Sequence, residues 1–380
     1  MFEFPTEISI DQILPFAVFA IFGLSWIIQM IYYWAVYSRL AFYRKKPAEP
    51  AQPPVSVVIC AKNEYQNLLK NLPSVLEQDY PEYEVIVVND ASDDDSIELL
   101  NSFSRKYRHL KIFDLERNLN FFSGKKFPLS LGINSAKHDI VLLTDADCKP
   151  AGPTWIKQMV SNYSEKTEVV LGYGTYRKTV GFLNQLIRYD AFLVAMQYMS
   201  YALAGMPYMG VGRNLSYKRG LFYKAKGFTS HYKLKSGDDD LFINRSATKS
   251  NTRIEISPDA HTISTAKASM VQWILQKRRH FTTAKYYRPK FKFLLSLSYI
   301  SKLLLYLSFV GILILNYNLL ITLIAFSVFF TSHWVILAFC TNKMRENDLA
   351  VLSPVLEILL LALSPIIYFS NLIIKQEKWK

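Results

Sequence analysis

Two aspartates separated by one small residue end an apolar run of strand length at residues 140–148. Asp145 and Asp147 would lie where that strand leaves a sheet, so that two carboxylates could share a divalent cation. Mg²⁺ and Mn²⁺ prefer oxygen ligands and usually complete their coordination with water and substrate phosphates. An Asp-rich turn without a metal is the alternative, because Asp is an ordinary turn residue. The motif alone leaves both interpretations open.

Further carboxylates follow other apolar runs. Asp90 comes directly after the run at 85–88, and the three aspartates at 238–240 open a predicted helix. Carboxylates suit that position because the N-terminal end of a helix carries partial positive charge. The aspartates at 93–95 are better explained as a solvated turn than as a set of ligands. The sequence therefore offers acids for metal binding and for proton transfer at several separate points.

Short apolar strands that alternate with helical stretches must position these acids. The predicted strands begin at residues 55, 85, 110, 140 and 169, and the last is expected to run to residue 175. This alternation indicates an α/β fold with a mostly parallel sheet, in which ligands bind at the carboxyl ends of the strands. Asp90, Asp145 and Asp147 all follow strand ends, which is where a nucleotide would lie.

Composition favours a soluble domain carried on membrane helices. Of the 380 residues, 51% are hydrophobic and 14% are aromatic. That is too apolar for an ordinary cytosolic enzyme and too polar for a pure membrane bundle. The three cysteines are scattered without a Cys-x-x-Cys pair, so neither a disulfide framework nor a zinc site is indicated. The net charge is +13, and its basic residues cluster beside the apolar runs.

The N-terminal apolar run, residues 13–37, is long enough to span a bilayer, which takes about 20 apolar residues. The segment before it, 1–12, is acidic, whereas basic residues follow it from Arg39 onwards. By the positive-inside rule, we expect residues 1–12 to be extracytoplasmic and the chain after the span to be cytoplasmic. A Pro- and Ala-rich linker, 38–54, would join the span to a catalytic domain at 55–260.

The C-terminal part of the chain returns to the membrane. Residues 261–292 mix aromatic and basic side chains, which is typical of an interfacial amphipathic segment on anionic lipid, and residues 293–374 hold three apolar runs. Two prolines interrupt the last run, so it is either a third span or a re-entrant or interfacial segment. Lys302 and Glu357 are charges within these runs, and we expect Lys302 to extend toward the interface. An earlier apolar helix, 186–208, is expected at the membrane face or beneath the site.

Several short motifs occur in the order found in the membrane-bound family-2 glycosyltransferases, the group of cellulose, chitin, hyaluronan and poly-N-acetylglucosamine synthases and ceramide glucosyltransferases. Each motif alone is weak, but together, on strand ends between membrane segments, they make a strong resemblance over about residues 54–285. The motifs are 55–59 with Asn63-Glu64, then Asn89-Asp90-Ala91-Ser92, Gly124-Lys125, Asp145-Ala146-Asp147, Asp238-Asp239, and Gln276-Lys277-Arg278-Arg279-His280. The last resembles a Gln-x-x-Arg-Trp motif in which His280 replaces tryptophan.

The resemblance implies a GT-A-type nucleotide-sugar-binding domain and a membrane-bound, inverting glycosyltransferase. It would move a sugar from a nucleotide-diphosphate sugar to a lipid or glycan acceptor near the membrane, with a divalent cation, Mn²⁺ or Mg²⁺, as cofactor. The expected location is the cell (inner) membrane, as a multi-pass protein with a cytoplasmic catalytic domain, and no nucleic-acid partner is expected. The alternatives are a processive polysaccharide synthase, a metal-dependent nucleotidyltransferase and an inactive membrane adaptor. A nucleotidyltransferase would leave 238–239 and the Gln276 motif unexplained. An inactive adaptor would not need intact acids at these positions.

Roles for single residues follow from the resemblance and from the chemistry of a leaving diphosphate. The metal ligands would be Asp147 and Asp145, and their cation would act as a Lewis acid. Contacts to the donor are assigned to Glu64, Asp90, Lys125, Asp145 and Arg279. Catalysis is assigned to Asp239 as the base, with Asp240 as the alternate, together with Gln276 and Arg279. Contacts to the acceptor are assigned to Asp238 and His280.

The roles of His280 and Arg213 each have two possible interpretations. Imidazole offers a weaker stacking surface than indole, so His280 favours the transfer of one or a few sugars over polymer synthesis. Packing at the membrane interface is the alternative role for His280. Arg213, in a glycine-containing loop, is balanced between a phosphate contact and a structural hydrogen bond.

Overall fold

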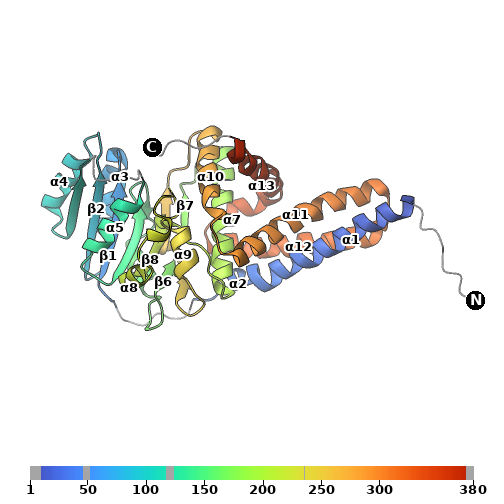
Figure 1. The fold of residues 1–380 in the computed structure, drawn as a ribbon, viewed down its shortest axis with the longest axis horizontal. Coiled ribbons are helices and arrows are strands. Elements are labelled where there is room, and N and C mark those ends of the chain that lie inside the picture. The colour runs from blue at the N-terminus through green and yellow to red at the C-terminus, as the bar shows by residue number, and fades with distance from the viewer. Residues whose placement is uncertain (1–9, 46–51, 117–123, 235, 374–380) are drawn as a thin grey trace, which may run out of the picture.

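The computed structural model describes residues 10–45, 52–116, 124–234 and 236–373. Most of the expected extracytoplasmic segment and part of the expected linker therefore lie outside the described residues. An α/β domain and a group of long helices follow one another along the longest axis of the molecule (Figure 1).

A seven-stranded sheet forms the centre of the α/β domain, in the order β3-β2-β1-β4-β8-β6-β9. The first four strands in this order are parallel, whereas β8 runs antiparallel to both of its neighbours. The mostly parallel α/β sheet predicted from the sequence is confirmed. Its strands are β1 (Val55–Ala61), β2 (Tyr83–Asp90), β3 (Leu110–Leu115), β4 (Ile140–Asp145), β6 (Val169–Leu171), β8 (Leu215–Lys218) and β9 (Thr252–Ile254).

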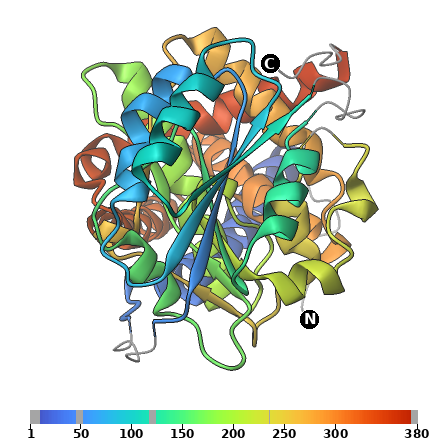
Figure 2. The same cartoon turned by 90° about the vertical axis from the view of Figure 1, so that its left-hand side faces the viewer.

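Helices cover both faces of this sheet, which is why its central strands are apolar on both sides. One face carries α3 (Tyr65–Leu76), α4 (Ser96–Lys106) and α6 (Trp155–Val160), and the other carries α5 (Lys126–Ser135). Figure 2 looks at the domain end-on and shows helices on either side of the central strands. Strand pairing sets Ala61 beside Asn89 and Cys60 beside Asp145. The ends of β2 and β4 therefore share one edge, with β1 between them.

The single strand expected at 169–175 is wrong, because the structure divides it between two sheets. β6 belongs to the main sheet, whereas β7 (Gly174–Tyr176) joins a three-stranded sheet with β5 (Lys149–Pro150) and β10 (Thr262–Ser264). The Asn214 side chain occupies the space that a Cβ at Gly172 would need, and its amide donates to the Tyr173 carbonyl at 2.8 Å. This side chain separates β6 from β7.

Four helices of the described chain are long and apolar enough to cross a membrane, in agreement with the four predicted apolar runs. α1 (Ile10–Ile31) continues through the π-helix η1 (Tyr32–Tyr37) into α2 (Ser38–Ala41), and the others are α11 (Pro289–Leu315), α12 (Leu319–Lys343) and α13 (Asn347–Ile373). In Figure 1, α1, α11 and α12 run together away from the α/β domain. By contrast, α13 lies at the base of this bundle, beside α7 (Phe182–Leu203) and α10 (Met270–Ala284).

Both ends of α13 contact the layer formed by α7 and α10. Near its start, Asp348 accepts hydrogen bonds of 2.7 and 2.8 Å from the guanidinium of Arg188 in α7. Near its end, Asn371 and Arg278 of α10 exchange two hydrogen bonds of 2.9 Å. A helix that crossed a bilayer alongside α11 and α12 would carry its end away from this layer. The contacts thus hold both ends of α13 against this layer, whereas α11 and α12 extend away from it (Figure 1).

The charges inside the bundle pair with one another. Lys302 of α11 donates to Glu357 of α13 and, at 2.9 Å, to the Tyr33 hydroxyl. The other oxygen of Glu357 lies 2.8 Å from Nε2 of His333 in α12. Lys302 therefore ends in an ion pair with α13, at the base of the bundle. A charge in an apolar environment is stabilised better by an opposite charge within the bundle, and this pairing joins α13 to α11 and α12.

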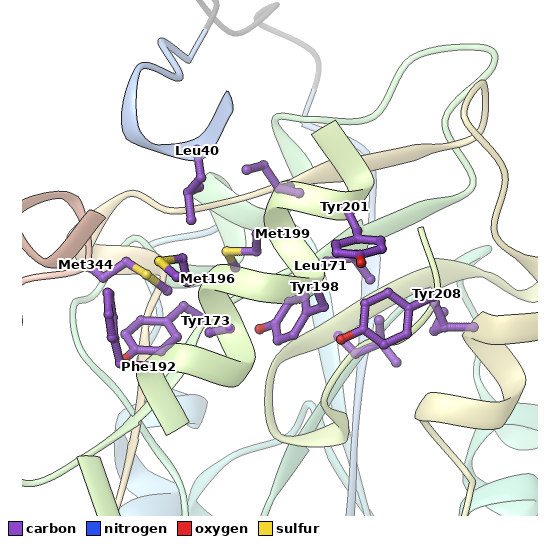
Figure 3. Close-up of a cluster of buried hydrophobic side chains, with 14 of the residues drawn as sticks. Leu40, Leu171, Tyr173, Phe192, Met196, Tyr198, Met199, Tyr201, Tyr208 and Met344 are labelled. Carbon is purple, nitrogen blue, oxygen red and sulfur yellow. The ribbon is translucent and has the colours of Figure 1, made fainter. Parts of the chain in front are cut away.

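α7 packs beneath the sheet, which is the second of the two positions expected for the apolar helix at 186–208. Tyr198 donates from its hydroxyl to the Gly172 carbonyl at 2.6 Å. Figure 3 shows the aromatic and methionine side chains of α7 gathered with Leu171 of β6, Leu40 of α2 and Met344, which follows α12. One apolar cluster thus extends from the sheet to the long helices.

A buried ion pair fastens the turn between α12 and α13 to the α/β domain. Arg188 is 2% exposed and Glu346 is 1% exposed, and two nitrogens of the guanidinium donate to one Glu346 oxygen. The other oxygen accepts from the hydroxyls of Thr175 at 2.5 Å and Tyr173 at 3.3 Å. The two charged residues are 158 positions apart, so no local pattern in the sequence marks the pair.

Replacing Glu346 by alanine is expected to lower the free energy of unfolding by about 3–5 kcal/mol, because Arg188 would lose its buried counter-charge and keep only the half-exposed Asp348 as a partner. The matched control is Lys178→Ala. The Lys178 side chain is 53% exposed and pairs with Asp348 at 2.9 Å beside the same turn. Its loss is expected to cost about 1 kcal/mol or less. Chemical denaturation of both variants in one detergent, followed by circular dichroism, measures the difference. Equally small losses would contradict the anchoring role.

Candidate functional site

The Asp-x-Asp motif lies at the end of β4, on the edge shared by the parallel strands. Candidate ligand atoms of Asp145, Asp147 and Cys148 all lie within 4.8 Å of one another. Lys125, directly before α5, donates to one oxygen of Asp145. Asp147 accepts from the hydroxyl of Ser264 in β10 at 3.1 Å. The motif therefore joins the end of the main sheet to the small sheet.

The donor set fits Mn²⁺ or Mg²⁺, because it offers the carboxylate oxygens that these hard cations prefer. Burial raises the pKa of the Cys148 thiol, and the charges of Asp147 and Asp145 raise it further. Hard cations also prefer oxygen to thiol sulfur, so Cys148 is a poor ligand for Mn²⁺ or Mg²⁺. The two aspartates are the side chains of this group that are suited to hold the predicted cation.

Three cations act on Asp145. Burial alone would raise the pKa of this carboxyl, but the charge of Lys125, followed by those of Arg213 and Arg279, outweighs burial and lowers it. Lys125 is in direct contact, whereas Arg213 of η2 (Gly212–Asn214) and Arg279 of α10 act through space. The structure thereby brings together the predicted donor residues Lys125, Asp145 and Arg279. It adds Arg213, which the sequence left between two roles.

Arg213 is held in place by contacts along its whole length. Its carbonyl accepts from the hydroxyls of Thr144 and Thr262 at 3.0 Å each. Its guanidinium lies 4.7 Å from the centre of the Tyr176 ring, as in a cation–π contact. Gln276 of α10 donates to the hydroxyl of the same tyrosine at 3.4 Å. Tyr176 therefore connects Arg213 to the helix that carries the Gln276 motif.

The other two predicted donor residues lie beside the neighbouring strands. Asp90 is the last residue of β2 and is buried, with Nζ of Lys62 3.9 Å from its carboxylate. Glu64 directly precedes α3 and accepts from the amide of Asn67 at 2.5 Å. In the turn at 93–95, Asp94 accepts two backbone hydrogen bonds of 3.0 and 3.2 Å, as expected of a turn residue. These residues lie along the strand ends that lead to Asp145.

Lys126 connects the donor side to the acid run at 238–240, a role the sequence analysis did not identify. Its ammonium is buried and donates to the carbonyls of Leu234 and, at 2.6 Å, Ser236. The only local signal was the position of a second lysine after the Gly-Lys motif. Asp238 also faces this side. Burial lowers the pKa of Lys125, but the charges of Asp145 and Asp238 outweigh it and raise the pKa.

The other two acids of the run have different surroundings. Asp240 is buried, and one of its oxygens accepts from the hydroxyls of Thr283 at 2.5 Å and Tyr287 at 2.8 Å. Asp239 is partly exposed and accepts from backbone N–H groups, from Gly212 at 2.8 Å and from Asp240 at 2.7 Å. Asp240 is therefore committed to holding α9 (Asp240–Ser246) against α10, whereas Asp239 remains accessible.

The pKa of Asp239 is raised to about 7 by its enclosed position and by the charges of Asp238 and Asp240. The backbone hydrogen bonds from Gly212 and Asp240 oppose this shift without cancelling it. A carboxyl with a pKa near the working pH can take a proton from a substrate and release it again. The geometry and the pKa therefore single out Asp239 as the group suited to proton transfer.

The predicted α10 motif lies on a helix beside the site. Gln276 and Arg279 are partly buried, whereas His280 is exposed. The spacing of three and four positions places all three on adjacent parts of the helix surface. The acceptor role of His280 stays a prediction.

The sequence of residues 56–229 matches the family model described as glycosyl transferase family 2. An uncharacterized glycosyltransferase of Haemophilus influenzae is 31% identical over 128 residues, 34% of this chain and 38% of that protein. A poly-beta-1,6-N-acetyl-D-glucosamine synthase of Staphylococcus epidermidis is 32% identical over 129 residues, 33% of this chain and 30% of that protein. The chain thus spans only about a third of the length of these curated relatives.

The fold has a counterpart among solved structures. A mannosyltransferase from Pyrobaculum calidifontis, in complex with GDP-Man and Mn²⁺, aligns with a TM-score of 0.57 over 90% of this chain and 98% of its own. Its sequence is 19% identical, so this likeness shows the fold alone. Together with the family match, it identifies a GT-A-like α/β domain flanked by apolar helices, in which residues 56–229 match glycosyltransferase family 2.

Proposed function

We propose that this chain is a membrane-bound, inverting glycosyltransferase that moves a sugar from a nucleotide-diphosphate donor to a lipid or lipid-proximal acceptor. The observation that carries the proposal is that η2 connects two acid groups: Arg213 acts on Asp145 at the end of β4, and the N–H of the adjacent Gly212 donates to Asp239 at the start of α9. The match of residues 56–229 to glycosyltransferase family 2 supports nucleotide-sugar chemistry. The four long apolar helices favour an acceptor at the membrane.

The leaving group of such a reaction is a diphosphate. Negative charge builds on the leaving oxygen while the anomeric carbon gains oxocarbenium character, as in glycoside cleavage. Lys125, Arg213 and Arg279 already act on Asp145 and are suited to stabilise that charge. Asp145 and Asp147 would hold Mn²⁺ or Mg²⁺, which when bound supplies Lewis-acid stabilisation of the leaving diphosphate. The Mn²⁺ in the Pyrobaculum mannosyltransferase supports this choice of cation.

Asp239 is proposed as the general base. The acceptor oxygen would attack the anomeric carbon, its proton would pass to Asp239, and the bond to the diphosphate would break in the same displacement, which inverts the configuration. Asp240, the alternate, is less suited because the hydroxyls of Thr283 and Tyr287 occupy its carboxylate. Gln276 would help to orient the acceptor from its contact with Tyr176.

The proposed acceptor side and orientation rest on the long helices. Basic residues Arg39, Arg288 and Lys290 lie near the domain end of the bundle, which supports a cytoplasmic catalytic domain in the cell (inner) membrane. The exposed imidazole of His280 supports the transfer of one or a few sugars, with processive polymer synthesis as the alternative. A nucleotidyltransferase would leave the acid run and the α10 motif without a use.

The function is tested by incubating purified protein and native lipids with a panel of nucleotide sugars. We expect release of a nucleoside diphosphate from at least one donor in Mn²⁺ or Mg²⁺, and none from the Asp147→Ala variant or in EDTA. Calorimetric titration should show that Asp147→Ala also loses Mn²⁺-dependent binding of the nucleoside diphosphate. Asp95→Ala, an exposed acid in the turn after β2, is the control and should keep both properties. Full turnover in EDTA would rule out the metal role.

Asp239→Asn should keep donor affinity and lose about 10²–10⁴-fold in the rate of transfer, because only proton transfer in the transition state is removed. Asp240→Asn should retain transfer, since Asp240 serves to hold α9 and α10 together. Donor titration and single-turnover kinetics on both variants separate binding from chemistry. If Asp240→Asn is inactive and Asp239→Asn is active, the base has been assigned one residue too early.

The pH profile should carry the signature of Asp239. The base must be ionised to act, so kcat/KM should be low in acid and rise as the pH passes through about 7, the raised pKa of this carboxyl. Asp240→Asn removes one of the charges that raise the pKa, so the rising limb should move to lower pH. A limb that stays at the same pH in Asp240→Asn would point to another titrating group.

A further inference from the structure

A cavity of about 510 Å³ opens between the α/β domain and the turn that follows α12. Asp147 and Ser264 form part of one wall, and Met344, Arg345 and Glu346 form part of another. The cavity therefore runs from the second aspartate of the Asp-x-Asp motif to the end of an apolar helix long enough to cross a membrane. Ligand sites are common at such junctions between two parts of a chain.

The cavity is lined by more positive than negative side chains. Its basic residues are Lys70, Lys149, Arg177, Lys178 and Arg345, and its acidic residues are Asp147, Asp259 and Glu346. Glu346 is neutralised by the buried guanidinium of Arg188, and Asp147 is a proposed metal ligand. Asp259 accepts from the Thr154 hydroxyl at 3.1 Å. The excess of positive charge favours an anionic occupant.

Most of these cations have no carboxylate partner within the part of the chain that the structure describes. Lys178 pairs with Asp348, whereas Arg345 and three cations of the α/β domain, Lys70, Lys149 and Arg177, form no ion pair with a described residue. All three are exposed to the cavity side of the surface. Their charges are thus available to a ligand.

The same three residues lie close to the metal motif along the chain or through hydrogen bonds to the backbone. Lys149 follows Asp147 by two positions. Next to Lys70, the amide of Asn71 donates to the Ala146 carbonyl at 3.2 Å. The Arg177 N–H donates to the Ser264 carbonyl at 2.8 Å, which holds it beside the residue that bonds Asp147. A group bound by these cations would therefore lie close to the proposed leaving diphosphate, in a cavity whose lining does not include the donor residues Glu64 and Asp90.

We propose that this cavity binds the phosphate group of a lipid acceptor, whose chain extends past Met344 toward the bundle. The proposal rests on the proposed function in treating the lipid as the acceptor. A guanidinium fork recognises phosphate oxygens in pairs, and lysines add point charges. Tyr176, which lines the cavity, also contacts Arg213 and Gln276. The bound head group is thereby next to the residues assigned to transfer.

Free phosphate and a phosphate-bearing lipid share this chemistry, and binding measurements separate them. The probes are hexadecyl phosphate, hexadecanol and inorganic phosphate, titrated into full-length protein in a non-ionic detergent. We expect hexadecyl phosphate to bind at least about tenfold more tightly than either of the other two, since only it joins a charge-assisted contact to an apolar chain. Equal affinity for hexadecanol would overturn the phosphate site, and equal affinity for inorganic phosphate would overturn the lipid source.

The variant Lys70→Gln/Arg177→Gln tests the residues. It should lose at least about tenfold in affinity for hexadecyl phosphate while its affinity for the nucleoside diphosphate in Mn²⁺ stays unchanged. Lys224→Gln, an exposed lysine at the end of α8 (Arg219–Lys224) and outside the cavity, is the matched control. Unchanged hexadecyl phosphate binding in the double variant, or a parallel loss of nucleoside diphosphate binding, would overturn the assignment.

These measurements need no turnover. Loss of lipid binding in the double variant supports the cavity assignment even where no nucleotide sugar is consumed, a result that would refute only the proposed function. Turnover on a lipid that carries no phosphate, unaffected by the double variant, would refute the cavity assignment and leave the proposed function in place.

Discussion

The contact between Arg188 and Glu346 is the constraint on which the relation between the α/β domain and the long helices depends. Two charges buried from water cost several kcal/mol unless their hydrogen bonds are satisfied. Here both oxygens of Glu346 are bonded, one by the guanidinium and one by hydroxyls of Thr175 and Tyr173. Such a pair tolerates little displacement. It therefore fixes the position of the turn after α12 relative to β7.

The position of this turn relative to β7 also affects the candidate site. β7 holds the turn through Thr175, and its next residue, Tyr176, contacts Arg213 and Gln276. The strand that anchors the membrane part thus also carries a wall of the catalytic region. α13 then lies across the base of the bundle, where Lys302 and His333 meet Glu357. A few ionic contacts in this way join the sheet to the apolar bundle. The proposed acceptor cavity lies between these two parts.

Unequal surroundings divide the work among the aspartates. Asp145 lies among cations that lower its pKa, so it stays ionised and suited to a metal ion. Asp239 lies among other acids that raise its pKa, so it is suited to exchange a proton. Asp240, of the same residue type and adjacent in sequence, is held by hydroxyls and serves the packing of α9. Environments that separate the pKa values of similar groups are a general way to assign an acid to its role.

Sequence alone was enough to predict the parallel strands β1 to β4, the apolar helices and the order of the acids, because local periodicity and strand-end motifs carry that information. It placed Lys125, Asp145 and Arg279 in one site, and the structure brings these three together. The division of 169–175 into β6 and β7 could not be predicted, because it depends on the inserted side chain of Asn214. The same holds for the pairing of Lys302, the position of α13 and the Arg188–Glu346 anchor. Each of these depends on residues far apart in the chain, whose attraction is specific in space and leaves no periodic trace in the sequence.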